Sequence, residues 1–101
     1  MALIRGTTPT IIFTFTDVLV SDISKAYLVI KQSGASVIEK DISSATVGED
    51  VRWTLEQEDT LSLKRKINAD IYCDWLLNDG TRGRSKIQTE SVEDSGIDEV
   101  I

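Results

Sequence analysis

Hydrophobic and polar residues alternate with a period of two along much of the chain. The clearest run covers residues 67–77. Its apolar positions are Ile67, Ala69, Ile71, Cys73, Trp75 and Leu77, and its polar positions include Asn68, Asp70, Tyr72 and Asp74. Strict alternation over this length is typical of a β-strand with one face in the core, and it does not fit the helical period of 3.6.

Four further segments predict strands. Residues 10–16 alternate threonines with the inward set Ile11, Phe13 and Phe15, and Pro9 stands at the start, where a missing N–H is tolerated. Residues 25–32 are apolar on both faces, which favours a central or covered strand. Residues 37–42 follow the turn at 33–36 as a hairpin partner, and residues 51–56 place Val51, Trp53 and Leu55 inward.

Two stretches break this alternation. Residues 43–50 are predicted as a loop with Gly48 at a turn. Residues 57–66 are polar apart from Leu61 and Leu63, and we expect them to cross between sheets through one helical turn near residues 58–61.

The sequence also predicts the register of a hairpin at residues 78–80. A two-residue loop would pair Trp75 with Arg84 and put an arginine on the core face. A three-residue loop with Gly80 in the left-handed conformation pairs Trp75 with Gly83, Ile71 with Ile87, and Asp74 with Arg84. The second register suits both faces, so we expect it, with a last strand over residues 82–92.

About six or seven strands without a long helical period indicate an all-β fold of the sandwich type. We expect residues 1–92 to form this domain and residues 93–101 to form an acidic C-terminal tail. The net charge of −6 comes largely from the chain end: residues 90–101 hold five acids and no base, whereas the first 89 hold 12 acids and 11 bases. A near-neutral body argues against nucleic-acid binding.

The composition excludes several kinds of catalytic site. The chain has no histidine and one cysteine, so histidine-based acid–base catalysis, Cys–His zinc sites and an internal disulfide are ruled out. We expect Cys73 to be a core residue and predict no catalytic residue, no cofactor and no metal. A hydrolase using two carboxylates would need them within about 5–10 Å of each other. Residues 1–9 do not resemble a secretory signal, and no apolar run reaches the length of a membrane span.

Two surfaces are candidates for binding a partner. Arg82, Arg84 and Lys86 occupy alternate positions of the last strand, facing the side of the sheet that carries Tyr72, and such a stripe could bind an acidic tail like residues 90–101 of a neighbouring copy. The simpler interpretation pairs Arg84 with Asp74 and Lys86 with Asp70. In the tail, Ile97, Val100 and Ile101 are apolar residues among acids, suited to docking on the body or on a partner. Trp53 and Trp75 are expected in the core, although an exposed pair would instead favour carbohydrate stacking.

Several short motifs resemble small proteins encoded by phages and prophages of Gram-positive bacteria. These are residues 4–10 leading into the strand at 11–15, residues 55–61 after the Trp53 strand, the hairpin at 79–81 before a strand containing Ser85, and the final Val100 and Ile101. The same order is similar to the N-terminal immunoglobulin-like domain of phage baseplate upper proteins, over nearly the whole chain. Those larger proteins continue into further modules, whereas these residues hold one domain.

The resemblance implies an immunoglobulin-like antiparallel β-sandwich and a non-enzymatic structural or assembly protein of a phage tail or baseplate. Its partners would be other phage structural subunits or copies of itself, with oligomers possible and no nucleic acid or membrane involved. It would be made in the host bacterial cytoplasm and become associated with the virion. The alternative is a β-sandwich module that binds a carbohydrate or another ligand.

Overall fold

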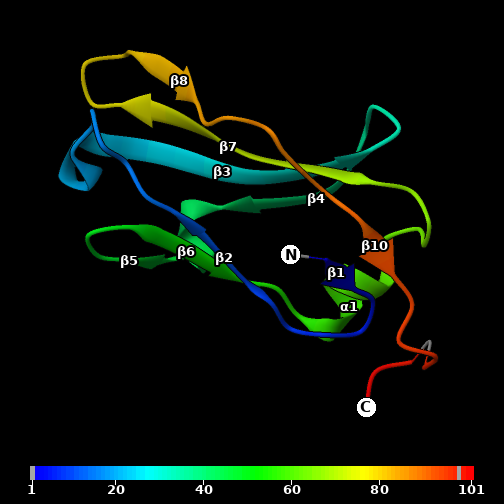
Figure 1. Ribbon diagram of the computed structural model, residues 1–101. Helices are drawn as coiled ribbons and strands as arrows, with labels where there is room; N and C mark the ends of the chain where they lie inside the picture. Colours follow the sequence, from blue (N-terminus) through cyan, green and yellow to red (C-terminus); the bar gives the residue numbers. More distant parts are fainter. Residues whose placement is uncertain (1, 98) are drawn as a thin grey trace.

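The computed structural model describes residues 2–97 and 99–101, and most of its strands form two antiparallel sheets in a β-sandwich-like arrangement (Figure 1). The larger sheet has the order β4 (Ala35–Asp41), β3 (Ile23–Gln32), β7 (Ala69–Leu77) and β8 (Arg82–Arg84), and β9 (Gln88–Glu90) also pairs with β7. The smaller sheet has the order β2 (Thr10–Phe13), β6 (Val51–Thr54) and β5 (Thr46–Val47). The fold is therefore all-β, as the alternation predicted.

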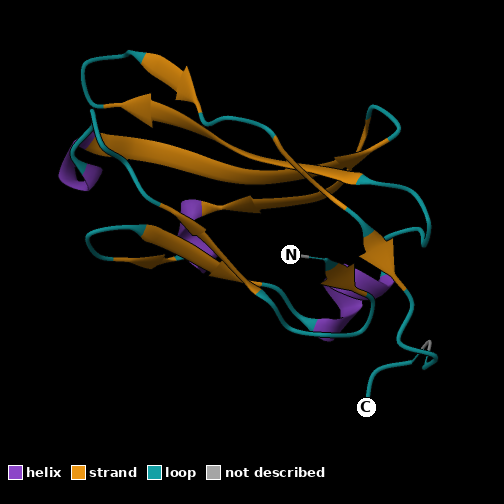
Figure 2. Cartoon of the chain, viewed as in Figure 1, coloured by secondary structure: helices purple, strands orange, loops and turns teal. Residues whose placement is uncertain are grey.

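The connections hold the few helical turns (Figure 2). The 3-10 turns η1 (Val20–Asp22) and η2 (Ile42–Ser44) lie where the chain passes between the sheets, and α1 (Gln57–Leu61) follows β6. The helical turn expected near residues 58–61 is thus confirmed. A capping box starts it: Glu56 and Asp59 each accept a backbone N–H from the other's position.

The core lies between the two sheets. Leu28 and Ile30 of β3 and Cys73 of β7 face Val51 and Trp53 of β6, and all five are at most 1 % exposed. The predicted inward faces are therefore correct for these strands. β3 is central, as its two apolar faces indicated: on its outer face Val29 is 7 % exposed.

The hairpin after β7 has the predicted three-residue loop. Leu77 N–H donates to Thr81 O (2.8 Å), and Gly80 adopts a φ of +90°, a conformation that favours glycine. The register pairs Asp74 with Arg84 and Trp75 with Gly83, as expected.

The continuation of this register is where the prediction is wrong. Cys73 N–H donates to Ser85 Oγ (2.9 Å) where a regular ladder would use a backbone carbonyl, and Ser85 N–H donates to Cys73 O (2.9 Å). The chain then shifts by one residue, so Ile71 pairs with Gln88 rather than Ile87, and Ile87 is 55 % exposed. The expected continuous strand over residues 82–92 is consequently broken into β8, β9 and a two-residue strand, β10 (Val92–Glu93).

Two pairings were not anticipated. β5 lies inside the segment expected to be a loop. At one end of the molecule β1 (Leu3–Ile4) pairs in parallel with β10 (Val92–Glu93), next to α1 (Figure 1). Leu3 and Val92 are both buried, so this two-stranded sheet closes the end of the core.

The Trp75–Gly83 pair gives a test of the register. A Cβ on Gly83 would lie 2.6 Å from Trp75 Nε1, closer than real Cβ contacts allow. We expect Gly83→Ala to lower the free energy of unfolding by about 1–3 kcal/mol, because the indole or β8 must move. Denaturant unfolding measures this. Gly48→Ala is the control: a Cβ added there would have no atom within 4 Å, so this variant should stay within about 0.5 kcal/mol of wild type. Equal stability of both variants would contradict the register.

Candidate functional site

A groove of about 640 Å³ opens between the edges of the two sheets. One wall is formed by β2 and the segment after it, residues 10–18. The opposite wall is formed by β7 and the irregular segment between β8 and β9, through Ile71, Trp75, Arg84, Ser85, Lys86 and Gln88. Among the described residues β2 pairs with β6 alone, so the groove runs along a strand edge that has no neighbour in this part of the sheet.

Aromatic and aliphatic side chains form the inner part of the groove. The rings of Phe15 and Trp75 meet edge to face with their centroids 5.1 Å apart. Both are only partly buried and pack against the core, whereas Trp53 is 1 % exposed. Of the two tryptophans, therefore, only Trp75 can contact a bound molecule. Threonines 10, 14 and 16 add hydroxyl groups along the β2 wall.

The three candidate cations do not form one stripe. Arg84 makes a two-point ion pair with Asp74, with Nε–Oδ1 2.6 Å and Nη2–Oδ2 3.3 Å, and this carboxylate raises the pKa of the guanidinium. Lys86 lies in the irregular segment beyond β8 and lines the groove. Asp70, expected beside Lys86, instead accepts a hydrogen bond from Thr89 Oγ1 (2.8 Å), because of the register shift at Ser85.

Tyr72 lies beneath Arg84 on the outer face of the large sheet. The guanidinium carbon is 4.4 Å from its ring centroid, Lys31 Nζ is 5.8 Å away, and the residue is 4 % exposed. The structure thus brings Tyr72 and Arg84 together, but it leaves Tyr72 covered. Arg82 lies apart, in a shallow hollow of about 220 Å³ shared with Tyr27 and Leu76.

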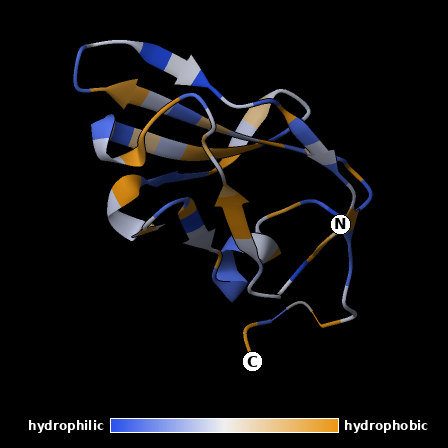
Figure 3. Ribbon diagram, turned by 60° about the vertical axis from the view of Figure 1, so that its left-hand side comes forward, coloured by the Kyte–Doolittle hydropathy of each residue, from blue (hydrophilic) through white to orange (hydrophobic). Residues whose placement is uncertain are grey.

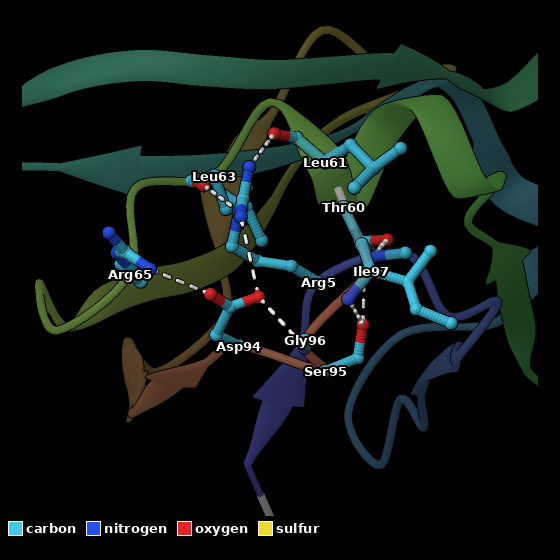
Figure 4. A network of polar contacts seen from close by, with 10 residues as sticks. Arg5, Thr60, Leu61, Leu63, Arg65, Asp94, Ser95, Gly96 and Ile97 are labelled. Carbon is cyan, nitrogen blue, oxygen red and sulfur yellow. Dashed lines mark hydrogen bonds and ion pairs between the residues drawn. The ribbon is translucent and has the colours of Figure 1, made fainter. Parts of the chain in front are cut away.

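A polar network holds the start of the C-terminal segment against the body (Figure 4). Asp94 accepts a hydrogen bond from Arg65 (2.8 Å) and lies 3.6 Å from Arg5 Nη1. Arg5 also donates to the carbonyls of Leu63 (2.8 Å) and Leu61 (3.0 Å). The N–H of Gly96 and the Arg65 guanidinium lower the pKa of the Asp94 carboxyl. The network therefore fixes the path of the chain as far as Gly96.

Beyond the turn, the apolar tail residues are exposed. Ile97, Val100 and Ile101 are 47 %, 51 % and 82 % exposed, and Figure 3 shows the hydrophobic chain end projecting from the sheets. The Gln57 side-chain amide pairs with both backbone groups of Ile101, at 3.0 and 2.7 Å. The hollows that Arg82, Arg84 and Lys86 line include none of these tail residues, so the two sets of candidates are not joined in one site.

The described residues offer no metal cluster, since no three of their Cys, Asp or Glu side chains gather suitably. Cys73 is fully buried, as predicted for a core residue, and burial together with the nearby Asp74 raises its thiol pKa to about 12. A thiol in this state is protonated at neutral pH and shielded from substrates, so it is a poor nucleophile. None of the helices in the described part of the chain has the length and hydrophobicity needed to cross a membrane.

Comparisons with family models, with curated proteins and with solved structures gave no match. The groove is thus the feature from which a function can be argued. The alternation in the sequence does not reveal this groove, because its walls come from segments about 70 residues apart in the chain. The only sequence signal is the uncharged run at residues 10–16, which by its alternation alone predicts an ordinary strand.

The Asp94 network makes a pH-dependent prediction. Because the folded pKa of Asp94 is lowered, its ionised form stabilises the fold above the ordinary value of 3.8, and this stabilisation is lost as pH falls through the folded value. Asp94→Asn should therefore be less stable than wild type at pH 7, and this difference should be smaller at about pH 2, where more of the carboxyl is protonated. Urea unfolding at both pH values tests this. Glu49→Gln, an exposed change, should show no such difference, and a loss of stability in Asp94→Asn that is equally large in acid would contradict the assignment.

Proposed function

We propose that this chain is a non-enzymatic structural or assembly protein of a phage, associated with the tail or baseplate, and that it acts by docking on other subunits. The observation that carries the proposal is the groove: a partly apolar cleft beside an unpaired strand edge is a recurrent way of binding another polypeptide. The motifs resembling phage baseplate upper proteins support the phage setting.

The proposal includes an immunoglobulin-like topology, with β2–β6–β5 as one sheet and β4–β3–β7–β8 as the other. It also includes synthesis in the host bacterial cytoplasm and incorporation into the virion. The chemistry agrees with docking rather than turnover. The Cys73 thiol is buried, and the two acids on the outer face of β7 are engaged, Asp74 by Arg84 and Asp70 by Thr89.

Photo-crosslinking in phage-producing cells tests this function. A benzophenone amino acid at Thr14 lies on the groove wall, whereas the same group at Val47, exposed on β5, lies on the opposite edge of the small sheet. We expect irradiation to join the Thr14 variant to a tail or baseplate subunit, identified by mass spectrometry, both in cells and in purified particles. The Val47 variant should give at least about tenfold less of this adduct. Absence of a structural-subunit adduct from Thr14 would refute the proposal.

A second candidate is a carbohydrate-binding module, favoured by one observation. Trp75 and Phe15 offer partly exposed rings in a groove that also carries threonine hydroxyls, and sugars stack on such rings. This function predicts that a glycan array gives binding that Trp75→Ala abolishes and that Trp53→Phe retains, because Trp53 is buried. A blank array would exclude it and leave the docking function unaffected.

A further inference from the structure

The groove is lined by nine consecutive residues on its β2 side, residues 10–18. Side chains of a strand alternate between two faces, so a pocket on one face would be lined by every second residue. Consecutive lining means instead that the groove follows the backbone edge of β2, which ends at Phe13 and not at residue 16 as expected, and of the segment after it, residues 14–18. An occupant of this groove therefore meets peptide groups as well as side chains.

The backbone groups on that edge are available for pairing. Leu55 N–H donates to Pro9 O (2.9 Å), so the backbone carbonyl of residue 9 faces β6. In an antiparallel ladder the backbone groups of residues 11 and 13 then also face β6. Those of Thr10 and Ile12 face away from it. Within residues 2–97 and 99–101, no backbone partner is present for these outward groups. The edge can thus accept one more strand.

The edge also lacks the usual protection. Residues 10–16 contain no charged side chain, although natural edge strands commonly carry lysine or another charge that prevents pairing. Pro9 protects only the start. An uncharged, apolar strand edge of this kind indicates a surface that is covered when the protein works.

The charged side chains that line the groove indicate which kind of strand it can bind. Lys86 has no ion-pair partner in the described part of the chain, and Asp17 is the only acid that lines the groove. A second copy would offer either β2, which brings no acidic side chain to Lys86 because residues 10–16 are uncharged, or its acidic tail. That tail is held within its own chain, since Asp94 is bonded by Arg65 and the backbone of Ile101 by the Gln57 amide. A strand from a different protein that alternates apolar and acidic residues would pack its apolar side chains on Phe15 and Trp75 and pair its acids with Lys86.

We propose that the groove binds an extended segment of a partner protein, which adds to the free edge of β2 as a further strand and places acidic side chains next to Lys86. This rests on the proposed docking function and specifies how the partner is held. Apolar side chains of the added strand would contact Phe15, Trp75 and Ile71, and the partner backbone would pair with Thr10 and Ile12.

A displayed library of random ten-residue peptides, selected on the immobilised full chain, tests this proposal. We expect enriched peptides to alternate apolar and acidic residues. Ile12→Pro removes an N–H that faces the groove and leaves every N–H that faces β6, so it should keep the β6 ladder and weaken the selected peptides at least about tenfold. Ile12→Val, which keeps the N–H, should bind within about twofold of wild type, and Lys86→Glu should weaken the acidic peptides about tenfold.

A second measurement does not depend on the proline variant folding. In the wild-type protein, the amides of Thr10 and Ile12 should become protected from hydrogen exchange when a selected peptide binds, while Thr46 on β5 should not change.

Three results would overturn the proposal: no enriched peptide, equal binding to wild type and a folded Ile12→Pro, or a concentration-dependent dimer that Ile12→Pro abolishes. The last would make a second copy the occupant. A Thr14 crosslink to a phage subunit without peptide selectivity would leave docking intact and refute strand addition. Selective peptide binding without such a crosslink would support strand addition and refute docking on a phage subunit.

Discussion

The position of the small sheet depends on the burial of the Trp53 indole. Trp53 projects from β6 into the core at 1 % exposure, its Nε1 donates to Asp41 O (2.9 Å) at the end of β4, and the Phe13 ring meets it edge to face at 5.8 Å. Truncating a buried tryptophan typically costs about 3–5 kcal/mol. The small sheet has only three short strands, so this side chain fixes β6, and through β6 it fixes β2 and one wall of the groove.

A second set of contacts fixes the ends of the fold through buried polar side chains. Gln32 is 4 % exposed, donates to the carbonyls of Lys64 and Ile67 (2.8 and 2.9 Å), and accepts from Lys64 N–H (2.8 Å). Thr60 is fully buried; its hydroxyl donates to Thr7 O (2.8 Å) and accepts from Gly6 N–H (2.9 Å). Such groups are expensive to bury unless all are paired, so they specify one path for the connecting loops.

The strands could be predicted from the sequence where alternation was long and one face had to be buried. The hairpin register could be predicted from two facts. The run at 67–77 alternates without a break, and only Gly83, not Arg84, suits the core position opposite Trp75. Ser85 was not predictable in the same way, because its hydroxyl replaces a backbone carbonyl and moves the chain by one residue, which exposes Ile87. The pairing of β1 with β10 involves two residues from each chain end, too few for any period to reveal.

The candidate site was less predictable than the fold. The three cations were expected to share a face, but the shift at Ser85 ends β8 at Arg84 and leaves Lys86 beside the groove. The groove itself arises from two edges far apart in the sequence, and tertiary packing alone brings them together. The immunoglobulin-like topology and the phage role rest on the resemblance and on the proposals that follow from it.

The uncharged edge at β2 makes the newly made protein prone to aggregate before assembly. Until its edge is covered, each molecule can template growth of a sheet from other chains, and the rate of that loss rises with the amount of uncovered protein. Under the proposed strand addition, a cell making this chain would need the partner at the same time and in matching amounts. Stoichiometry and timing of synthesis, more than affinity, would then decide how much of the chain reaches its destination.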